Sequence, residues 1–155
     1  MAEAGQQPTP AEIGSWMEQN DRFASLLGIR LDSSAAGRAQ ASMEVKPEML
    51  NAVGILQGGA TFTLADFAFA VASNSHGTVA VSLNAQITYT AASQAGDRLV
   101  ATATEVSRTR STGLYQIEVY NGDGQLVAHF TGTVYRRKDG LEEWMKTETS
   151  EGEQK

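Results

Sequence analysis

The chain has 155 residues, of which 41% are apolar and 19% charged, which is typical of one folded domain and argues against a disordered chain. It contains no cysteine, which excludes disulfide bridges, thiolate zinc sites and a thiol nucleophile. The net charge is −6, and no basic stripe of the kind that nucleic-acid binding requires is present.

The first predicted element is a helix that begins at a capping box. Thr9 suits the N-cap, Pro10 the first helical position, and Glu12 the third. Gly28 ends the run, and a break near Asn20-Asp21 divides it in one interpretation of the pattern. The apolar face of this region consists of Ile13, Trp16, Met17, Phe23, Leu26 and Leu27.

Two short strands are predicted next. Residues 38–45 alternate strictly between polar and apolar side chains, which predicts a half-buried strand. Residues 29–32 are the expected partner, with a turn over residues 33–37.

A second, buried helix is predicted over residues 58–73, because apolar side chains occur on nearly all of its sides. Gly77 ends it, and Asn74 and His76 fall in its last turn.

Four runs rich in β-branched and aromatic residues follow, and each predicts a strand. A strong hairpin turn at residues 121–124 separates the last two. The order of elements predicts an α+β fold in which a long antiparallel sheet wraps around one central buried helix, with an N-terminal helix outside it. The four runs are Val79–Thr90, Arg98–Thr109, Leu114–Tyr120 and Gln125–Arg137.

One domain is therefore expected over residues 1–138. Residues 139–155 contain six acidic residues and two lysines, and they are expected to form a solvated, mobile tail. No run reaches the roughly 18 to 20 apolar residues of a membrane span, and the first ten residues lack the features of a secretory signal. A cytoplasmic protein with no membrane or nucleic-acid partner is the expectation.

Asp66 is the only charged residue in the predicted buried helix. A carboxylate is costly to bury alone, so it should be paired, neutralised or directed at a cleft. A structural role, in which Asp66 bonds a nearby backbone group, is an equally good interpretation.

Gly58 and Gly59 stand at the start of the same helix. The surrounding residues 54–61 resemble a nucleotide phosphate loop, but Ala60 occupies the place of the required lysine, which excludes that function. The two glycines would let a ligand approach backbone N–H groups that have no intrahelical partner. Tight packing against the sheet would favour the same glycines.

Other chemistry finds little support. The serine-hydrolase elbow and the paired-histidine zinc motif are both missing, and two histidines, His76 and His129, are too few for most metal sites. No metal and no cofactor are predicted. Basic residues at two strand ends are either solvated or hold a phosphorylated ligand tail: Arg108, Arg110, Arg136, Arg137 and Lys138.

Several motifs together resemble one known family. Over about residues 20–138 the chain is similar to hotdog-fold acyl-CoA thioesterases of the phenylacetate-pathway (PaaI) type. The resemblance implies hydrolysis of an acyl-CoA or aryl-CoA thioester by a homodimer, or by a dimer of dimers, which is a homotetramer. It rests on Met49-Leu50-Asn51, Leu56-Gln57-Gly58-Gly59, the segments 64–70 and 72–77, Val81-Ser82, Ile87-Thr88-Tyr89 and the segment 128–132.

The resemblance also implies roles for individual residues. Asp66 is the nucleophile or general base, and the Gly59 N–H polarises the thioester carbonyl. Asn51 lies near the carboxylate, and Ser82 helps to place water. The expected substrate-binding residues are Gly58, Tyr89, Arg108, Arg110 and Ser111, the last three where such proteins meet the CoA nucleotide.

Gln57 departs from the family, which usually has histidine before the two glycines. Glutamine can orient a carbonyl or a water but does not titrate near neutral pH. This change supports an alternative function, a non-catalytic acyl-CoA binding or sensing module, against which the retained Asp66 argues. A hydratase or dehydratase is disfavoured because no Asp-His pair is apparent. The identity of the acyl group stays open. The size of the pocket that holds it is expected to depend on Phe62, Phe67 and Phe69.

Overall fold

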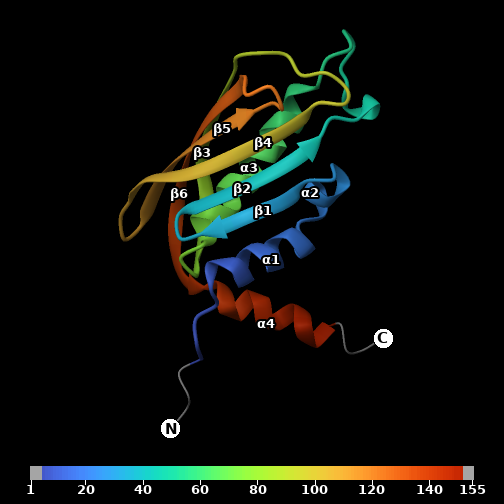
Figure 1. Cartoon of the computed structure of the whole chain (residues 1–155). Coiled ribbons are helices and arrows are strands. Elements are labelled where there is room, and N and C mark those ends of the chain that lie inside the picture. The colour runs from blue at the N-terminus through green and yellow to red at the C-terminus, as the bar shows by residue number, and fades with distance from the viewer. Residues whose placement is uncertain (1–4, 152–155) are drawn as a thin grey trace.

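The computed structural model describes residues 5–151, which form one curved antiparallel sheet around a central helix (Figure 1). The strand order is β1-β2-β4-β5-β6-β3. The strands are β1 (Arg30–Ala35), β2 (Arg38–Glu44), β3 (Thr78–Tyr89), β4 (Arg98–Arg108), β5 (Thr112–Tyr120) and β6 (Leu126–Gly140). The helices are α1 (Pro10–Asn20), α2 (Arg22–Leu26), α3 (Gly58–Asn74) and α4 (Leu141–Glu151), with a short 3-10 turn over Pro47–Met49. The predicted α+β arrangement is confirmed.

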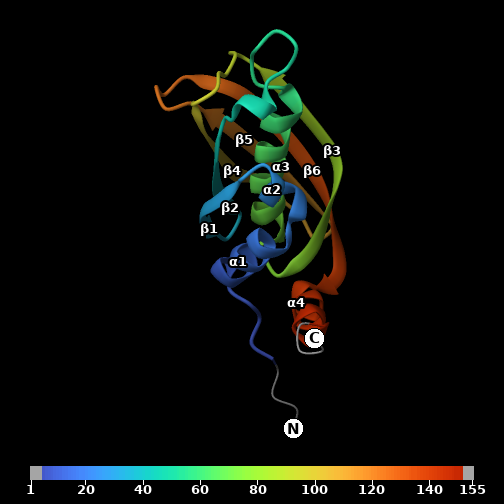
Figure 2. The same ribbon diagram turned by 90° about the vertical axis from the view of Figure 1, so that its right-hand side faces the viewer.

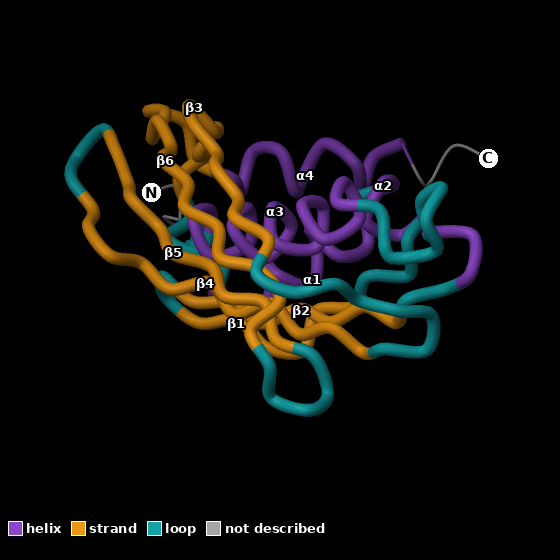
Figure 3. Tube along the Cα trace, turned by 90° about the horizontal axis from the view of Figure 1, so that it is seen from above, coloured by secondary structure: helices purple, strands orange, loops and turns teal. Residues whose placement is uncertain are grey.

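Helix α3 lies in the concave face of the sheet (Figures 2 and 3), which is why its sequence lacks a polar face. Phe69 is 1% exposed and its ring packs against Tyr115 and Phe130, with ring centroids 5.7 and 5.6 Å away. Gly132 of β6 lies under the same ring. A Cβ atom there would come within 2.5 Å of the Phe69 ring, so the close approach of helix and sheet requires glycine at this position.

The N-terminal region forms two helices, as the break near Asn20-Asp21 indicated. The capping box is present, since Thr9 Oγ1 accepts from the Glu12 N–H (3.2 Å) and the Thr9 N–H donates to Glu12 Oε2 (2.7 Å). Asp21 ends α1 and caps α2, where its carboxylate accepts from the Ala24 N–H (2.9 Å). Both helices contact α3 on the side that the sheet leaves open (Figure 2).

The sheet differs from the prediction in two places. Strand β1 runs to Ala35, past the predicted end at residue 32, because its hydrogen-bonded pairing with β2 continues up to a tight turn at Gly37, which has φ +71°. Strand β6 runs to Gly140, so the predicted domain boundary at residue 138 falls inside a strand.

Helix α4 follows β6 directly and was not predicted, since residues 139–155 were assigned to an acidic tail. Leu141 is 4% exposed and its N–H donates to the Gly77 carbonyl (2.9 Å), which fixes the start of the helix. The mobility expected for the tail stays a prediction. Over the residues that the structure describes, no helix combines the length and apolar content needed to cross a membrane.

Candidate functional site

The loop before α3 is organised by Asn51. Its side-chain carbonyl accepts from the Val53 N–H (3.0 Å) and the Ile55 N–H (3.3 Å), and its own N–H donates to the Ile55 carbonyl (2.8 Å). The Gln57 N–H then donates to the Met49 carbonyl (2.9 Å). These contacts fix the chain as it enters α3. Asn51 was predicted to lie near the catalytic carboxylate. Within one chain its side-chain oxygen accepts hydrogen bonds from its own loop.

Gln57 is the N-cap of α3. Its side-chain carbonyl accepts a short hydrogen bond from the Gly59 N–H, the group predicted to polarise the substrate carbonyl. The Ala60 N–H donates to the Gln57 backbone carbonyl (3.0 Å). The Gly58 N–H, at the first position of the helix, has no acceptor within residues 5–151. Among the two glycines at the start of α3, the Gly58 N–H is the one without an acceptor, and the role predicted for the Gly59 N–H stays a prediction.

Two cavities flank the start of α3. The first, here called the α2 cavity, has a volume of about 760 Å³ and lies between α2 and the first two turns of α3, where Gln57 and Gly59 line it. The second, here called the Tyr89 cavity, has a volume of about 410 Å³ and is lined by Asn51, Gly58 and Tyr89. The Tyr89 hydroxyl donates to the Gly58 carbonyl (2.7 Å). Five of the predicted site residues thus meet at this end of the helix.

Asp66 lies farther along α3, is partly buried, and lines neither cavity. Its carboxylate accepts no hydrogen bond from any group in the described part of the chain. Burial raises the pKa of Asp66, and the negative charge of Asp21 raises it further. An acid of this kind can take up a proton near neutral pH more readily than an exposed one, which suits general-base chemistry. Sequence reasoning did not identify Asp21, because only the fold brings α2 beside α3.

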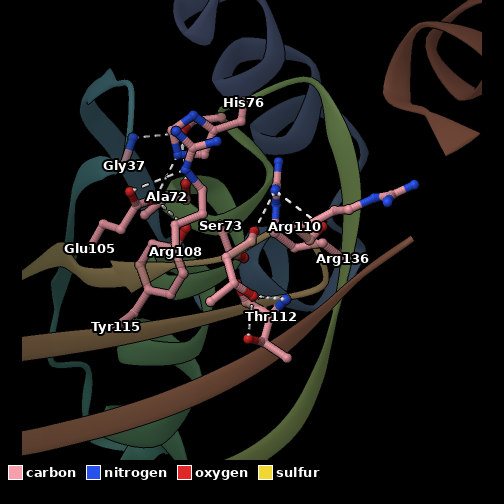
Figure 4. A network of polar contacts seen from close by, with 12 residues as sticks. Gly37, Ala72, Ser73, His76, Glu105, Arg108, Arg110, Thr112, Tyr115 and Arg136 are labelled. Atoms are coloured by element: carbon pink, nitrogen blue, oxygen red, sulfur yellow. Dashed lines mark hydrogen bonds and ion pairs between the residues drawn. The ribbon is translucent and has the colours of Figure 1, made fainter. Parts of the chain in front are cut away.

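The remaining predicted residues lie elsewhere. Ser82 is exposed on β3, opposite Val134 of β6. Arg108, Arg110 and Ser111 are exposed at the turn between β4 and β5. This turn adjoins the C-terminal end of α3 (Figure 4), roughly 25 Å from Gly58 by the length of a 17-residue helix. Within one chain these arginines lie at the opposite end of α3 from Gly58.

The C-terminal end of α3 is held by a polar cluster around Glu105 (Figure 4). The Glu105 carboxylate lies 2.6 Å from His76 Nε2 and accepts a hydrogen bond from the Tyr115 hydroxyl (2.7 Å). Burial by itself would raise the pKa of Glu105, but the hydrogen bonds from Tyr115 and His76 and the charge of Arg108 outweigh it and lower this pKa. His76, which was predicted only to fall in the last turn of the helix, thus anchors the end of α3 to β4.

The aromatic residues expected around the ligand are in the core instead. Phe67 and Phe69 are 2% and 1% exposed, and Phe62 packs edge-on against Phe130 with a centroid distance of 5.2 Å. None of the three lines either cavity, so the expectation that they set pocket size is corrected. Phe62 and Phe69 pack against Phe130 of β6, and Phe67 belongs to the buried core.

Comparison with known proteins gives consistent matches. The family model of the thioesterase superfamily matches residues 53–128. The chain is 41% identical over 120 residues to the acyl-coenzyme A thioesterase PaaI of Escherichia coli, an alignment that covers 77% of this chain and 86% of that protein. The structure of the E. coli PaaI protein from the phenylacetic acid degradation operon superposes with a TM-score of 0.81 at 36% identity, covering 85% of this chain and 99% of that one. The structure of smu.793 from Streptococcus mutans bound to acetyl-CoA matches with a TM-score of 0.68 at 31% identity, over 70% and 88% of the two chains.

Proposed function

Since the chain belongs to the thioesterase superfamily and is a thioester hydrolase with the hotdog fold of PaaI, we propose that its substrates are acyl-CoA or aryl-CoA thioesters. The acetyl-CoA bound by the S. mutans relative supports a CoA thioester as the ligand. The observation that carries the proposal is the start of α3, where Gly58, whose N–H is unpartnered, lines the Tyr89 cavity. Release of free thiol from a panel of acetyl-, octanoyl-, benzoyl- and phenylacetyl-CoA tests it. Binding of these thioesters without any release would favour the non-catalytic module.

The start of α3 supplies the first requirement of thioester hydrolysis. Attack on the carbonyl carbon moves negative charge to the carbonyl oxygen, and N–H groups at a helix N-terminus stabilise that charge together with the helix dipole. The Gly58 N–H is free to do so, and the Gly59 N–H becomes available when Gln57 turns away. Gln57 itself can orient the carbonyl or a water, as the histidine of relatives would, but without carrying a charge.

Asp66 supplies the second requirement. As general base it would take the proton from the attacking water; as nucleophile it would form an anhydride that water then cleaves. In either case CoA leaves as the thiol and the acid is released. Of the two standing interpretations of Asp66, its unpaired carboxylate favours the catalytic one over a backbone-bonding one.

One chain does not bring these two requirements together. Gly58 and Asp66 are eight residues apart on α3, which is roughly 12 Å along the axis. A reacting thioester needs both a donor and the carboxylate within about 3 Å of its carbonyl group. The site is therefore proposed to lie between two chains whose α3 helices run antiparallel, so that each Gly58 faces the Asp66 of the other chain.

Strand β3 is the proposed dimer contact. It is an edge strand that pairs only with β6, and Val81 and Leu83 on it are 41% and 62% exposed. A long, open strand with apolar side chains is prone to pair with another chain. A two-fold axis at this edge is the commonest geometry for a homodimer. It would place Ser82 at the interface and the Arg108 turn of one chain toward the Gly58 end of the other. A dimer of dimers and a cytoplasmic location stay predictions.

The raised pKa of Asp66 predicts a pH dependence. The charged carboxylate is the active form, so the rate should fall as the pH drops through this raised pKa. Asp21→Asn removes the neighbouring negative charge and should lower the pKa of Asp66, which shifts the acidic limb of the pH–rate profile to lower pH. Asparagine is an equally good N-cap, so α2 should persist. Asp123→Asn, in the exposed β5–β6 turn, is the control and should leave the profile unchanged. An unmoved limb in Asp21→Asn would contradict this account.

The basic turn between β4 and β5 predicts a substrate difference. The double change Arg108→Ala with Arg110→Ala should raise KM for acyl-CoA by roughly 10-fold or more, because charge-assisted contacts to the CoA phosphates are lost. Thioesters of pantetheine carry no nucleotide and should be affected little. Arg30→Ala is a matched control, since Arg30 is an exposed arginine of β1 that pairs with Glu18 of α1. Equal losses on both kinds of thioester would place these arginines outside the nucleotide site.

A further inference from the structure

Helix α2 holds two large apolar side chains at the mouth of the α2 cavity. Phe23 and Leu26 both line this cavity and are 59% and 75% exposed. Met49 and Leu50, which follow β2, and Ala60 of α3 also line it. Apolar residues that gather around a concave surface usually mark a binding site rather than chance exposure.

The uncharged polar groups of this cavity come from the start of α3. Gln57, Gly59 and Thr63 line the wall that α3 contributes, and the Thr63 hydroxyl donates to the Gly59 carbonyl (2.8 Å). The polar wall is thus the start of α3, where the thioester carbonyl is proposed to bind. A group attached to that carbonyl would extend from α3 toward α2.

The charges at the rim oppose each other. Lys46 and Glu48 both line the cavity and both are exposed, so the rim carries no net charge. The residues that line the cavity from α2 and α3 are all uncharged. The cavity is therefore suited to an uncharged apolar group, and it lies within the usual size range of small-molecule sites.

We infer that the α2 cavity binds the acyl group of the substrate, and that Phe23 and Leu26 select apolar acyl groups larger than acetyl. This inference rests on the proposed hydrolysis of CoA thioesters and names the part of the chain that sets its specificity. An acetyl group ends at the wall of α3, whereas a longer chain or a ring reaches α2. The residues that select the substrate thus come from a helix outside the sheet, not from the aromatic residues of α3.

The test compares two substrates in two variants. Phe23→Ala and Leu26→Ala should each lower kcat/KM for octanoyl-CoA by about 10-fold or more, since lost apolar contacts in a pocket discriminate on this scale. Acetyl-CoA should change less than about two-fold, because it does not reach α2. Val53→Ala is the matched control: Val53 is 79% exposed but lines neither cavity, and its removal should leave the ratio of the two substrates unchanged.

Two results would overturn the inference. One is a kcat/KM that falls equally for both substrates, or that falls for neither. The other is an unchanged substrate ratio with an altered oligomeric state in size-exclusion chromatography, which would assign Phe23 and Leu26 to a contact with a second copy. Calorimetric binding of octanoyl-CoA separates this inference from the proposed function: if the parent hydrolyses nothing, weaker binding by Leu26→Ala still supports the acyl site, and equal binding refutes it.

Discussion

Asp66→Asn is expected to keep the fold and to lower kcat by about 100-fold or more, the range typical of a lost general base. Asparagine has nearly the same shape, but it neither takes up a proton nor attacks a carbonyl. Stability should not fall. Because burial raises the pKa of the Asp66 carboxyl, the charged form destabilises the folded state at neutral pH, and a neutral amide removes that penalty. Thiol release measures the first effect and thermal unfolding the second.

Asp123→Asn provides the comparison for this variant, since it makes the same chemical change on an exposed turn and should leave kcat intact. An Asp66→Asn protein that unfolds would reveal a structural carboxylate. One that retains full activity would remove Asp66 from the mechanism and leave the family assignment untouched.

A mixed dimer is expected to recover activity that neither parent has. One chain carries Asp66→Asn and the other Gly58→Pro, in which proline removes the free N–H. Proline suits the first position of a helix, and Gln57 before it already has ψ 130°, which a following proline favours. With a shared site, the intact Gly58 of the first chain meets the intact Asp66 of the second. One of the two sites then works, and the hybrid should have about half of the native activity.

Two differently tagged chains allow the hybrid to be purified away from both homodimers, which must be folded and inactive. A Gly58→Pro homodimer that remains active would move the carbonyl donor to Gly59. A dead but folded hybrid would show that each site lies within one chain. The ring and hydroxyl of Tyr89 lie within 2.9 Å of a Cβ at position 58, so the fold of this variant should be checked by its thermal unfolding.

The features that sequence predicted best are those with a local physical signal. The capping box is a local signal because Thr9 and Glu12 are only three residues apart. The lack of a polar face on α3 likewise reflects burial on nearly all of its sides. Helix α4 lacked such a signal, because its charged residues are equally compatible with a solvated tail. The bond from Gly59 to Gln57 depends on one side-chain rotamer, so the sequence suggested two free glycine N–H groups where the structure has one.

The site shows the same division. Gln57, Gly58, Gly59 and Asn51 are close in sequence and lie together at the start of α3, although Asn51 was predicted to lie near the Asp66 carboxylate. Asp21, Phe23 and Leu26 reach the site region only because α2 folds back over α3, a contact that no local pattern encodes. The arginines at the β4–β5 turn were predicted to serve the same ligand; the structure places them at the other end of α3, and their role stays a prediction.

The polar cluster around Glu105 has a mechanical consequence. Glu105 anchors His76 just beyond the last turn of α3, and the Ser75 hydroxyl accepts from the Gly37 N–H (2.8 Å) to hold the same end. At the opposite end the Tyr89 hydroxyl donates to the Gly58 carbonyl (2.7 Å), and the Leu56 N–H, just before the helix, donates to the Ser93 carbonyl (2.8 Å). With both ends held, α3 presents the Gly58 N–H in one position before a thioester binds, as a preorganised donor requires.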